Sequence, residues 1–209
     1  MELIAIDLET TGLDPSRDRI VEIGAVRLGR SAAGGLVAGE RFQTFVDPGR
    51  PLDPAITRLT GIRDEDLRGA PDVASALAAF TAFAGRDCLV GHNVAFDLAF
   101  LERAGLAPGQ PSLDTVELAS ILWPEASSYA LQRLAAEAHL DPGSAHRALD
   151  DALTCASLLG ELAGAAAALR PELLEELRQA AAPLGEPVAA FFADALRTAL
   201  RAAWSERAP

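Results

Sequence analysis

The sequence predicts an α/β protein: a mixed β-sheet flanked by helices, with a helical extension at the C-terminus. Three strand-like segments follow one another between residues 3 and 46 with only short turns between them, which predicts an antiparallel meander. From residue 88 on, another apolar strand pattern is followed mainly by helical patterns. A chain of 209 residues with 50% hydrophobic residues suffices for one domain, or for one domain and a small helical appendage.

Each element is predicted from hydrophobic periodicity and from the residues that interrupt it. Strands are expected at residues 3–9, 19–28, 40–46 and 88–92. Helical turns are expected at 54–67, and helices at 72–84, 95–104, 114–122, 129–138, 146–163, 171–182 and 187–203. The alanine-rich stretch at 163–169 ends at Pro171, so we expect a domain at 1–165 and a helical extension at 166–209.

The charge composition narrows the classes of function. The formal net charge is −12, which disfavours a protein that grips a long duplex through bulk positive charge but suits one that holds only a strand end. All 18 basic residues are arginines, so lysine-based Schiff-base chemistry and a Walker-type phosphate loop are excluded. The two cysteines, Cys88 and Cys155, lie far apart in apolar segments and are expected to be buried thiols.

The sequence shows no targeting or membrane signal. Acidic residues near the N-terminus do not fit a signal peptide. No apolar run approaches the ~18 residues that a membrane span needs. We therefore expect a cytoplasmic protein with no membrane segment.

Two carboxylates stand in the first apolar strand. Alternation places Asp7 and Glu9 on one face, about 7 Å apart along the strand, where they can hold divalent cations. The alternative is a strand end that emerges into solvent, with Glu9 as the start of a polar loop. Thr10 and Thr11 follow at once, and their hydroxyl and N–H groups suit a phosphate or a terminal sugar.

Two further carboxylates are expected on inward-facing helix stripes. Asp97 shares its stripe with apolar residues, which indicates an inward-facing carboxylate. The alternative is that Asp97 only stabilises the helix N-terminus through the helix dipole. Asp151 lies on the apolar stripe of the helix at 146–163, whereas its neighbour Asp150 lies on the polar stripe. His146, at the entry of this helix, is a candidate general base. His92 ends a strand and is expected either to contact substrate or to stabilise a local turn.

The order and spacing of these segments resemble one family of nucleases. The matching motifs, spread over roughly residues 2–162, are DLETTGL, RIVEIGAV, FVDPGRPLDPAITRLTGI, GHNVAFDLAFL, LDTVELA and HRALDDA. They resemble the DEDDh exonucleases, which include DnaQ-type proofreading subunits, RNase T and oligoribonuclease. The resemblance implies a ribonuclease-H-like fold with a five-stranded mixed sheet. It departs at Thr60, where many members have a histidine before Gly-Ile.

The same resemblance assigns roles to individual residues. The four metal ligands fall on Asp7, Glu9, Asp97 and Asp151, and the general base falls on His146. Two Mg²⁺ or Mn²⁺ ions are the implied cofactors. The implied substrate contacts are Thr10, Thr11, Leu13, His92, Asn93 and Phe96.

The implied activity is a metal-dependent 3′→5′ exonuclease that acts on the 3′ end of DNA, preferably single-stranded, and releases nucleoside 5′-monophosphates. One alternative is a short-RNA 3′ exonuclease, because the family uses the same residues on RNA and DNA. Another is a strand-end-binding accessory module of a polymerase or helicase, although the intact set of five residues argues against lost catalysis. Residues after Pro171 resemble the region that joins the exonuclease domain to the helicase in some DinG-like proteins. We therefore expect residues 166–209 to be accessory or a linker, and a polymerase or helicase to be a possible partner.

Overall fold

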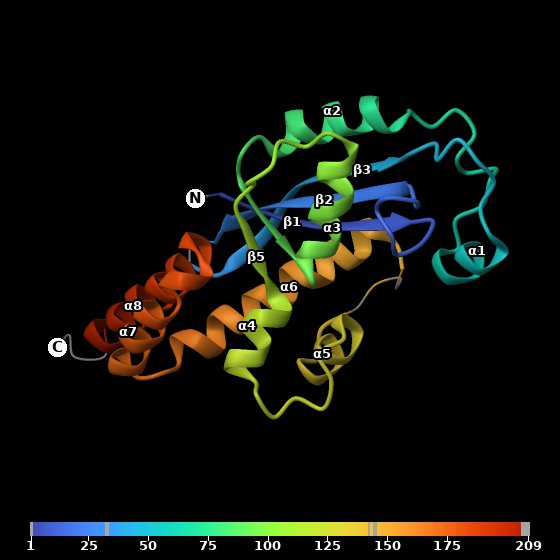
Figure 1. Ribbon diagram of the computed structural model, residues 1–209. Coiled ribbons are helices and arrows are strands. Elements are labelled where there is room, and N and C mark those ends of the chain that lie inside the picture. Colours follow the sequence, from blue (N-terminus) through green and yellow to red (C-terminus); the bar gives the residue numbers. More distant parts are fainter. Residues whose placement is uncertain (1, 32–33, 142, 144–145, 206–209) are drawn as a thin grey trace.

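The sheet holds five strands in the order β3-β2-β1-β4-β5 (Figure 1). The computed structural model describes residues 2–31, 34–141, 143 and 146–205. The strands are β1 (Leu3–Thr10), β2 (Ile20–Arg30), β3 (Leu36–Phe45), β4 (Cys88–Gly91) and β5 (Ser112–Asp114). The first three pair antiparallel as a meander, and β4 and β5 run parallel to β1. The sheet is therefore mixed, as the sequence predicts.

Helices cover both faces of the sheet. They are α1 (Pro54–Thr60), α2 (Val73–Ala84), α3 (Val94–Ala104), α4 (Thr115–Leu122), α5 (Leu131–Glu137), α6 (Ala148–Ala167), α7 (Pro171–Ala180) and α8 (Glu186–Ser205), with a 3-10 turn at Ala182–Leu184. Figure 1 shows α2 on one side of the sheet and α6 running diagonally across the other. This arrangement confirms the predicted α/β class and the ribonuclease-H-like architecture.

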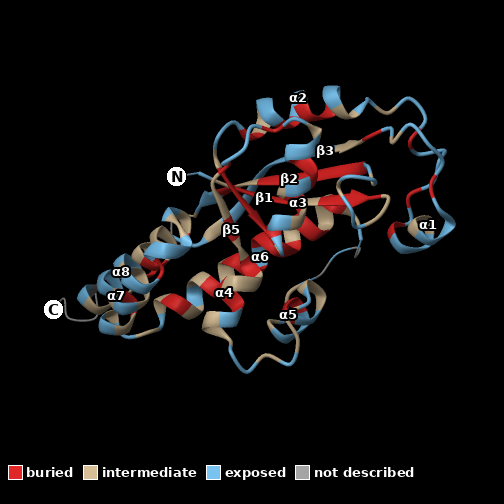
Figure 2. Ribbon diagram, in the orientation of Figure 1, coloured by how far each residue is buried: buried red, intermediate tan, exposed pale blue. Residues whose placement is uncertain are grey.

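The alternation predicted for β1 explains why there is a core on each face. Ile4, Ile6 and Leu8 pack into the cluster that includes α2 and α3, whereas Ala5 packs into the cluster that includes α6. Figure 2 shows the resulting red, buried band through the central strands and α6. A carboxylate on the Ala5 face of β1 therefore points toward α6.

Several element boundaries differ from the prediction. The three-residue strand β5 was not predicted, because Ser112–Asp114 is too short to show alternation. The third strand begins at Leu36 rather than 40. Helix α1 ends at Thr60 because Gly61 turns the backbone into the left-handed region at φ 74°, so the helical turns expected up to residue 67 are not helix.

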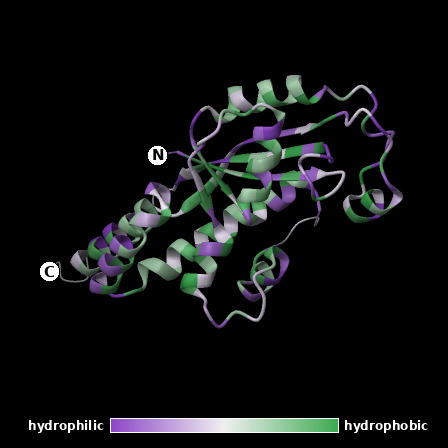
Figure 3. Ribbon diagram, in the orientation of Figure 1, coloured by the Kyte–Doolittle hydropathy of each residue, from purple (hydrophilic) through white to green (hydrophobic). Residues whose placement is uncertain are grey.

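The two C-terminal helices pack onto the end of the sheet away from α1 (Figure 1). Phe192 of α8 and Leu174 of α7 belong to the same buried cluster as Leu159 and Leu162 of α6. In Figure 3 both helices carry purple and green segments, as the predicted amphipathic pattern requires. The boundary predicted near residue 165 falls within the last turns of α6, and the division into two domains stays a prediction. Within the described residues, no helix has the length and apolar character to cross a membrane.

Candidate active site

Asp7 and Glu9 lie where β1 extends past its parallel neighbour. β1 pairs with β4 only from Leu3 to Ala5, so the second half of β1 has no partner strand on that side. On its other side β1 pairs with β2, which places Glu9 opposite Glu22 and Asp7 opposite Gly24. The pairing shifts by a bulge after Glu9, and the chain then enters the loop toward residue 18.

Asp97 reaches this position from the first turn of α3. The chain turns sharply after β4, because Asn93 has a left-handed backbone at φ 67°. The carboxylate of Asp114, at the end of β5, holds this turn by accepting the backbone N–H groups of Asn93 and Val94 at 3.1 and 3.0 Å. Asp97 is only 3% exposed, and its carboxyl group is hydrogen bonded to the backbone of Leu8 in β1. The predicted inward orientation of Asp97 agrees with this burial.

The first turn of α6 contributes Asp151, which is 7% exposed. Its Oδ1 accepts the side-chain amide of Gln132 at 2.7 Å, and its Oδ2 accepts the backbone N–H of His146 at 2.9 Å. His146 is exposed and has a left-handed backbone at φ 63°, so it stands just before the helix rather than inside it. Ligand atoms of Glu9, His146 and Asp151 all lie within 4.8 Å of one another, which makes this group able to hold a metal ion.

Burial and crowding raise the pKa values of all four carboxyl groups. Burial raises the pKa of Asp97 to about 8 and that of Glu9 to about 7, with neighbouring carboxylates adding to both effects. The pKa of Asp7 lies well above its ordinary value, through burial and then through Asp97, Asp151, Glu9 and Glu22. Burial also raises the pKa of Asp151, although the N–H of His146 opposes the effect. Without added positive charge, the site resists full ionisation.

The predicted substrate contacts fall into two segments beside these carboxylates. In the loop after β1, Thr10 bonds to the carbonyl of Gly12 at 2.6 Å, and Arg50 donates to the hydroxyl of Thr11 at 2.7 Å. Leu13, in the same loop, is 84% exposed. This loop is therefore held by its own polar contacts while an apolar side chain projects from it.

The second segment joins β4 to α3. Asn93 is exposed, and Phe96 is half-buried against Phe100 with ring centroids 5.0 Å apart. Both ring nitrogens of His92 already have partners, the hydroxyl of Thr115 at 2.9 Å and the carbonyl of Tyr129 at 2.7 Å. This geometry favours the turn-stabilising alternative for His92; a substrate contact by any of these residues stays a prediction.

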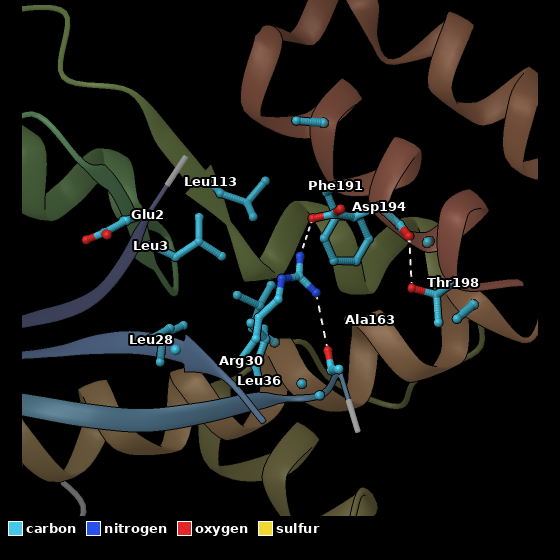
Figure 4. A pocket seen from close by; sticks show the side chains of 18 of the residues that line it. Glu2, Leu3, Leu28, Arg30, Leu36, Leu113, Ala163, Phe191, Asp194 and Thr198 are labelled. Carbon is cyan, nitrogen blue, oxygen red and sulfur yellow. Dashed lines mark hydrogen bonds and ion pairs between the residues drawn. The ribbon is translucent and has the colours of Figure 1, made fainter. Parts of the chain in front are cut away.

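A separate cavity of about 790 Å³ lies at the opposite end of the sheet, between the β2–β3 hairpin, α6 and α8 (Figure 4). Leu3, Leu36 and Phe191 supply apolar lining, and the ion pair between Arg30 and Asp194 crosses it. None of the predicted catalytic residues lines this cavity. This cavity is therefore separate from the cluster of carboxylates.

Sequence reasoning missed the partners that hold these groups. Gln132 and Asp114 support Asp151 and the α3 turn, and Glu22 bonds to the start of α6. A signal was present for Glu22, because it is a lone carboxylate in the apolar strand RIVEIGAV, like Asp7 in LIAIDLE. Its partner lies 125 residues away along the chain, and no local pattern reveals that pairing.

Comparison with known proteins identifies the family. The profile of the exonuclease family matches residues 4–159, and the chain belongs to this family, the DnaQ-like (DEDDh) exonucleases. The predicted enzyme class, a nuclease of the hydrolase type, is confirmed by this membership.

The curated relatives are far longer proteins. A DNA polymerase III PolC-type protein of Halalkalibacterium halodurans is 37% identical over 163 residues, which are 76% of this chain and 11% of that protein. One from Latilactobacillus sakei is 38% identical over 167 residues, with 77% and 11% covered. The chain thus spans about one ninth of the length of these relatives.

Solved structures give the same fold. A structure of exonuclease X in complex with 5′ overhanging duplex DNA superposes with a TM-score of 0.62 at 27% identity, covering 78% of this chain and 91% of that one. A structure of exonuclease I superposes with a TM-score of 0.65 at 20% identity, covering 84% and 43%. The second likeness shows the fold alone.

Proposed function

We propose that this chain is a metal-dependent 3′→5′ exonuclease that removes nucleoside 5′-monophosphates from the 3′ end of single-stranded DNA. The observation that carries the proposal is the convergence of Glu9, His146 and Asp151 within 4.8 Å, beside Asp7 and Asp97. Four carboxylates and an imidazole from three separate segments have no evident use as a structural cluster, because the mutual repulsion of the carboxylates opposes folding.

The residues at this site fit divalent cations. All four carboxyl groups are hard oxygen ligands of the kind that Mg²⁺ and Mn²⁺ prefer, and burial and neighbouring carboxylates raise their pKa values, an effect that bound cations would oppose. Asp7, Glu9, Asp97 and Asp151 would hold the ions. Two dications would balance the four carboxylates and allow a phosphodiester to approach an acidic protein.

The chain's own residues then perform the hydrolysis. Divalent ions held by these carboxylates would supply positive charge that stabilises the charge developing in the reaction. His146, exposed at the entry of α6, accepts a proton from the attacking water. The water oxygen bonds to phosphorus, the bond from phosphorus to the 3′ oxygen breaks, and that oxygen takes a proton from solvent. The products are a nucleoside 5′-monophosphate and a strand that is one nucleotide shorter with a free 3′-OH.

Two apolar side chains beside the carboxylates, one exposed and one half-buried, support binding of a strand end. Leu13 projects from the loop after β1, and Phe96 lies at the start of α3 next to the exposed Asn93. Nucleobases stack on an aromatic ring such as that of Phe96 without sequence preference, and Leu13 offers an apolar contact. DNA is favoured over RNA because the relatives are DNA polymerase III proteins and exonuclease X was solved with DNA. The same relatives support a proofreading role beside a polymerase, with α7 and α8 packed against the helix α6.

The test compares single-stranded DNA and RNA of equal sequence, each labelled at the 5′ end, with Mn²⁺ and with Mg²⁺. We expect a ladder that shortens by one nucleotide at a time from the 3′ end, with faster loss of DNA. A strand with a 3′-phosphate and a circular strand should both resist, whereas a 5′ block should have no effect.

Each arm of this experiment can overturn a different part of the proposal. Rapid cutting of the circular strand would identify an endonuclease. Faster loss of RNA would favour the short-RNA alternative. Tight binding of strand ends without any product, at all metal concentrations, would identify an accessory module.

A further inference from the structure

Glu22 is a charged residue in the middle of β2 that is completely buried, with 0% of its surface exposed. Its carboxylate accepts four hydrogen bonds. Oε1 accepts from Gln43 Nε2 at 2.7 Å and from Arg147 Nη2 at 3.0 Å, and Oε2 accepts from Arg147 Nε at 3.2 Å and from the backbone N–H of Ala148 at 3.2 Å. Three of these four bonds come from the start of α6.

These bonds cap the N-terminus of α6, which has no side-chain cap of its own. The residue before α6, Arg147, makes no side-chain capping bond to the helix, so the first N–H groups need an acceptor from elsewhere. Glu22 provides that acceptor from the sheet, and its negative charge suits a helix N-terminus. Arg147 compensates the buried charge, and its guanidinium also lies over the ring of Phe45, 5.6 Å from the centroid.

A glycine two residues further along β2 allows the close approach. A Cβ atom at Gly24 would lie 2.2 Å from the backbone carbon of Ala148 and 2.2 Å from the backbone nitrogen of Leu149. The backbone of the first turn of α6 therefore rests directly on β2. In the register of the sheet, Glu22 and Gly24 stand opposite Glu9 and Asp7, the two carboxylates of β1.

From this geometry we propose that Glu22 is a positioning residue for the exonuclease reaction: with Arg147, it fixes the start of α6 against β2 and so places Asp151 and His146 beside Glu9. This inference rests on the proposed function for the roles of these three residues. Asp151 lies in the first turn of α6, and the backbone N–H of His146 bonds to its carboxylate at 2.9 Å. A small shift of the helix start moves both side chains together relative to β1.

Two substitutions at Glu22 separate the loss of its hydrogen bonds from the loss of its charge, because both remove the charge but only alanine removes all the bonds. In Glu22→Gln the remaining oxygen can still accept from Arg147 Nε and Ala148 N–H, while the amide nitrogen faces Gln43, which can turn its own oxygen toward it. Glu22→Ala loses all four bonds. Outer partners that orient metal ligands are worth about 10- to 100-fold in metal affinity or activity. We expect wild type, Glu22→Gln and Glu22→Ala to fall in that order, with the alanine variant about 10- to 100-fold below wild type in kcat and nearly unchanged in KM.

A matched control lies on the same strand. Arg27 also makes polar contacts from β2. They are partly buried to Asp87 at 2.7 Å and to the carbonyl of Phe83 at 2.6 Å, and exposed to Glu2 at 2.7 Å, and they lie at the end of the strand away from Asp151. Arg27→Ala should lower the melting temperature and leave kcat within about threefold of wild type. All variants are compared well below their melting temperatures, with folding verified by circular dichroism.

The second readout is Mn²⁺ binding by isothermal titration calorimetry, which does not depend on turnover. Glu22→Ala should weaken Mn²⁺ binding about 10-fold or more, and Arg27→Ala should not. Normal Mn²⁺ affinity and normal kcat in folded Glu22→Ala would overturn the positioning role, as would an equal loss in Arg27→Ala. If wild type binds Mn²⁺ but degrades no nucleic acid, the proposed function fails, whereas the calorimetric comparison still decides whether Glu22 places the metal ligands.

Discussion

Asp97→Asn should stabilise the metal-free protein at alkaline pH while it abolishes activity. Asp97 is 3% exposed, and burial raises its pKa from the ordinary 3.8 to about 8, with Asp114 and Glu9 adding to the effect. Asparagine keeps the shape of the side chain and can still accept a hydrogen bond from the backbone of Leu8. It removes the charge that the folded site resists in the absence of a cation.

The sign of the effect follows from the direction of the shift. Since the folded-state pKa lies above the unfolded one, the unfolded chain releases this proton more easily, and stability falls as pH rises from about 4 to about 8. Below that window the carboxyl group is protonated in both states and costs nothing. Each pKa unit corresponds to about 1.4 kcal/mol, so the shift to about 8 implies a penalty on the order of 5 kcal/mol at pH 8.

Thermal unfolding in excess chelator measures this penalty. For a chain of this size about 1 kcal/mol shifts the melting temperature by about 2–4 °C, so Asp97→Asn should melt about 10 °C or more above wild type at pH 8. At pH 5 the difference should shrink to a few degrees. Glu102→Gln removes an exposed carboxylate from the same helix and should change the melting temperature little at either pH.

Added Mn²⁺ should reverse the order. Wild type gains stability from binding the ion, whereas Asp97→Asn has lost a ligand and gains less. If Asp97→Asn is less stable than wild type in chelator at pH 8, or if the difference is the same at pH 5, the carboxyl group of Asp97 does not carry the assigned cost.

Three further outcomes test the site itself. Chelation should abolish nuclease activity, and Ca²⁺ should support strand binding without efficient turnover; full activity in excess chelator would contradict a metal-dependent reaction. His146→Ala should lower kcat roughly 10²- to 10⁴-fold while strand binding persists, measured by single-turnover kinetics and fluorescence anisotropy, and near-normal turnover would place the general base elsewhere. Asp151→Asn should be inactive at saturating Mg²⁺, whereas Asp150→Asn should retain activity within a few-fold; the reverse result would show that the helix stripe was misassigned.

The sequence alone predicted the main elements of the fold because hydrophobic periodicity is a local signal. The alternation of β1 correctly divided Ile4 and Ile6 from Ala5, which pack into different cores on the two faces of the sheet. Boundaries were less predictable. The helix expected from residue 146 begins at Ala148, because His146 has a left-handed backbone that no periodic pattern reveals.

The same contrast applies to the site. A carboxylate in an apolar stripe is conspicuous, so the sequence predicts inward positions for Asp7, Asp97 and Asp151 without knowledge of what lies next to them. The residues that hold them were not found, because their bonds join distant segments: Gln132 reaches Asp151 from α5, and Asp114 reaches the α3 turn from β5. A sequence can show which side chains are costly to bury, but the folded chain decides which groups offset that cost.

The acidic composition also bears on how the protein would bind a nucleic-acid strand. Ion pairs to carboxylates engage Arg27, Arg30, Arg50, Arg63, Arg147, Arg178 and Arg197. Carboxylates therefore neutralise seven of the 18 arginines, and the net charge of −12 disfavours a basic tract that follows a phosphate backbone. On the proposed function, we expect affinity for a strand to come mainly from its end. The contacts would be stacking on Phe96, an apolar contact with Leu13, and the divalent ions that the carboxylates would hold for the terminal phosphate. Stacking on an aromatic ring contributes about 1–3 kcal/mol per base whatever the sequence, which suits an enzyme that must accept any terminal nucleotide.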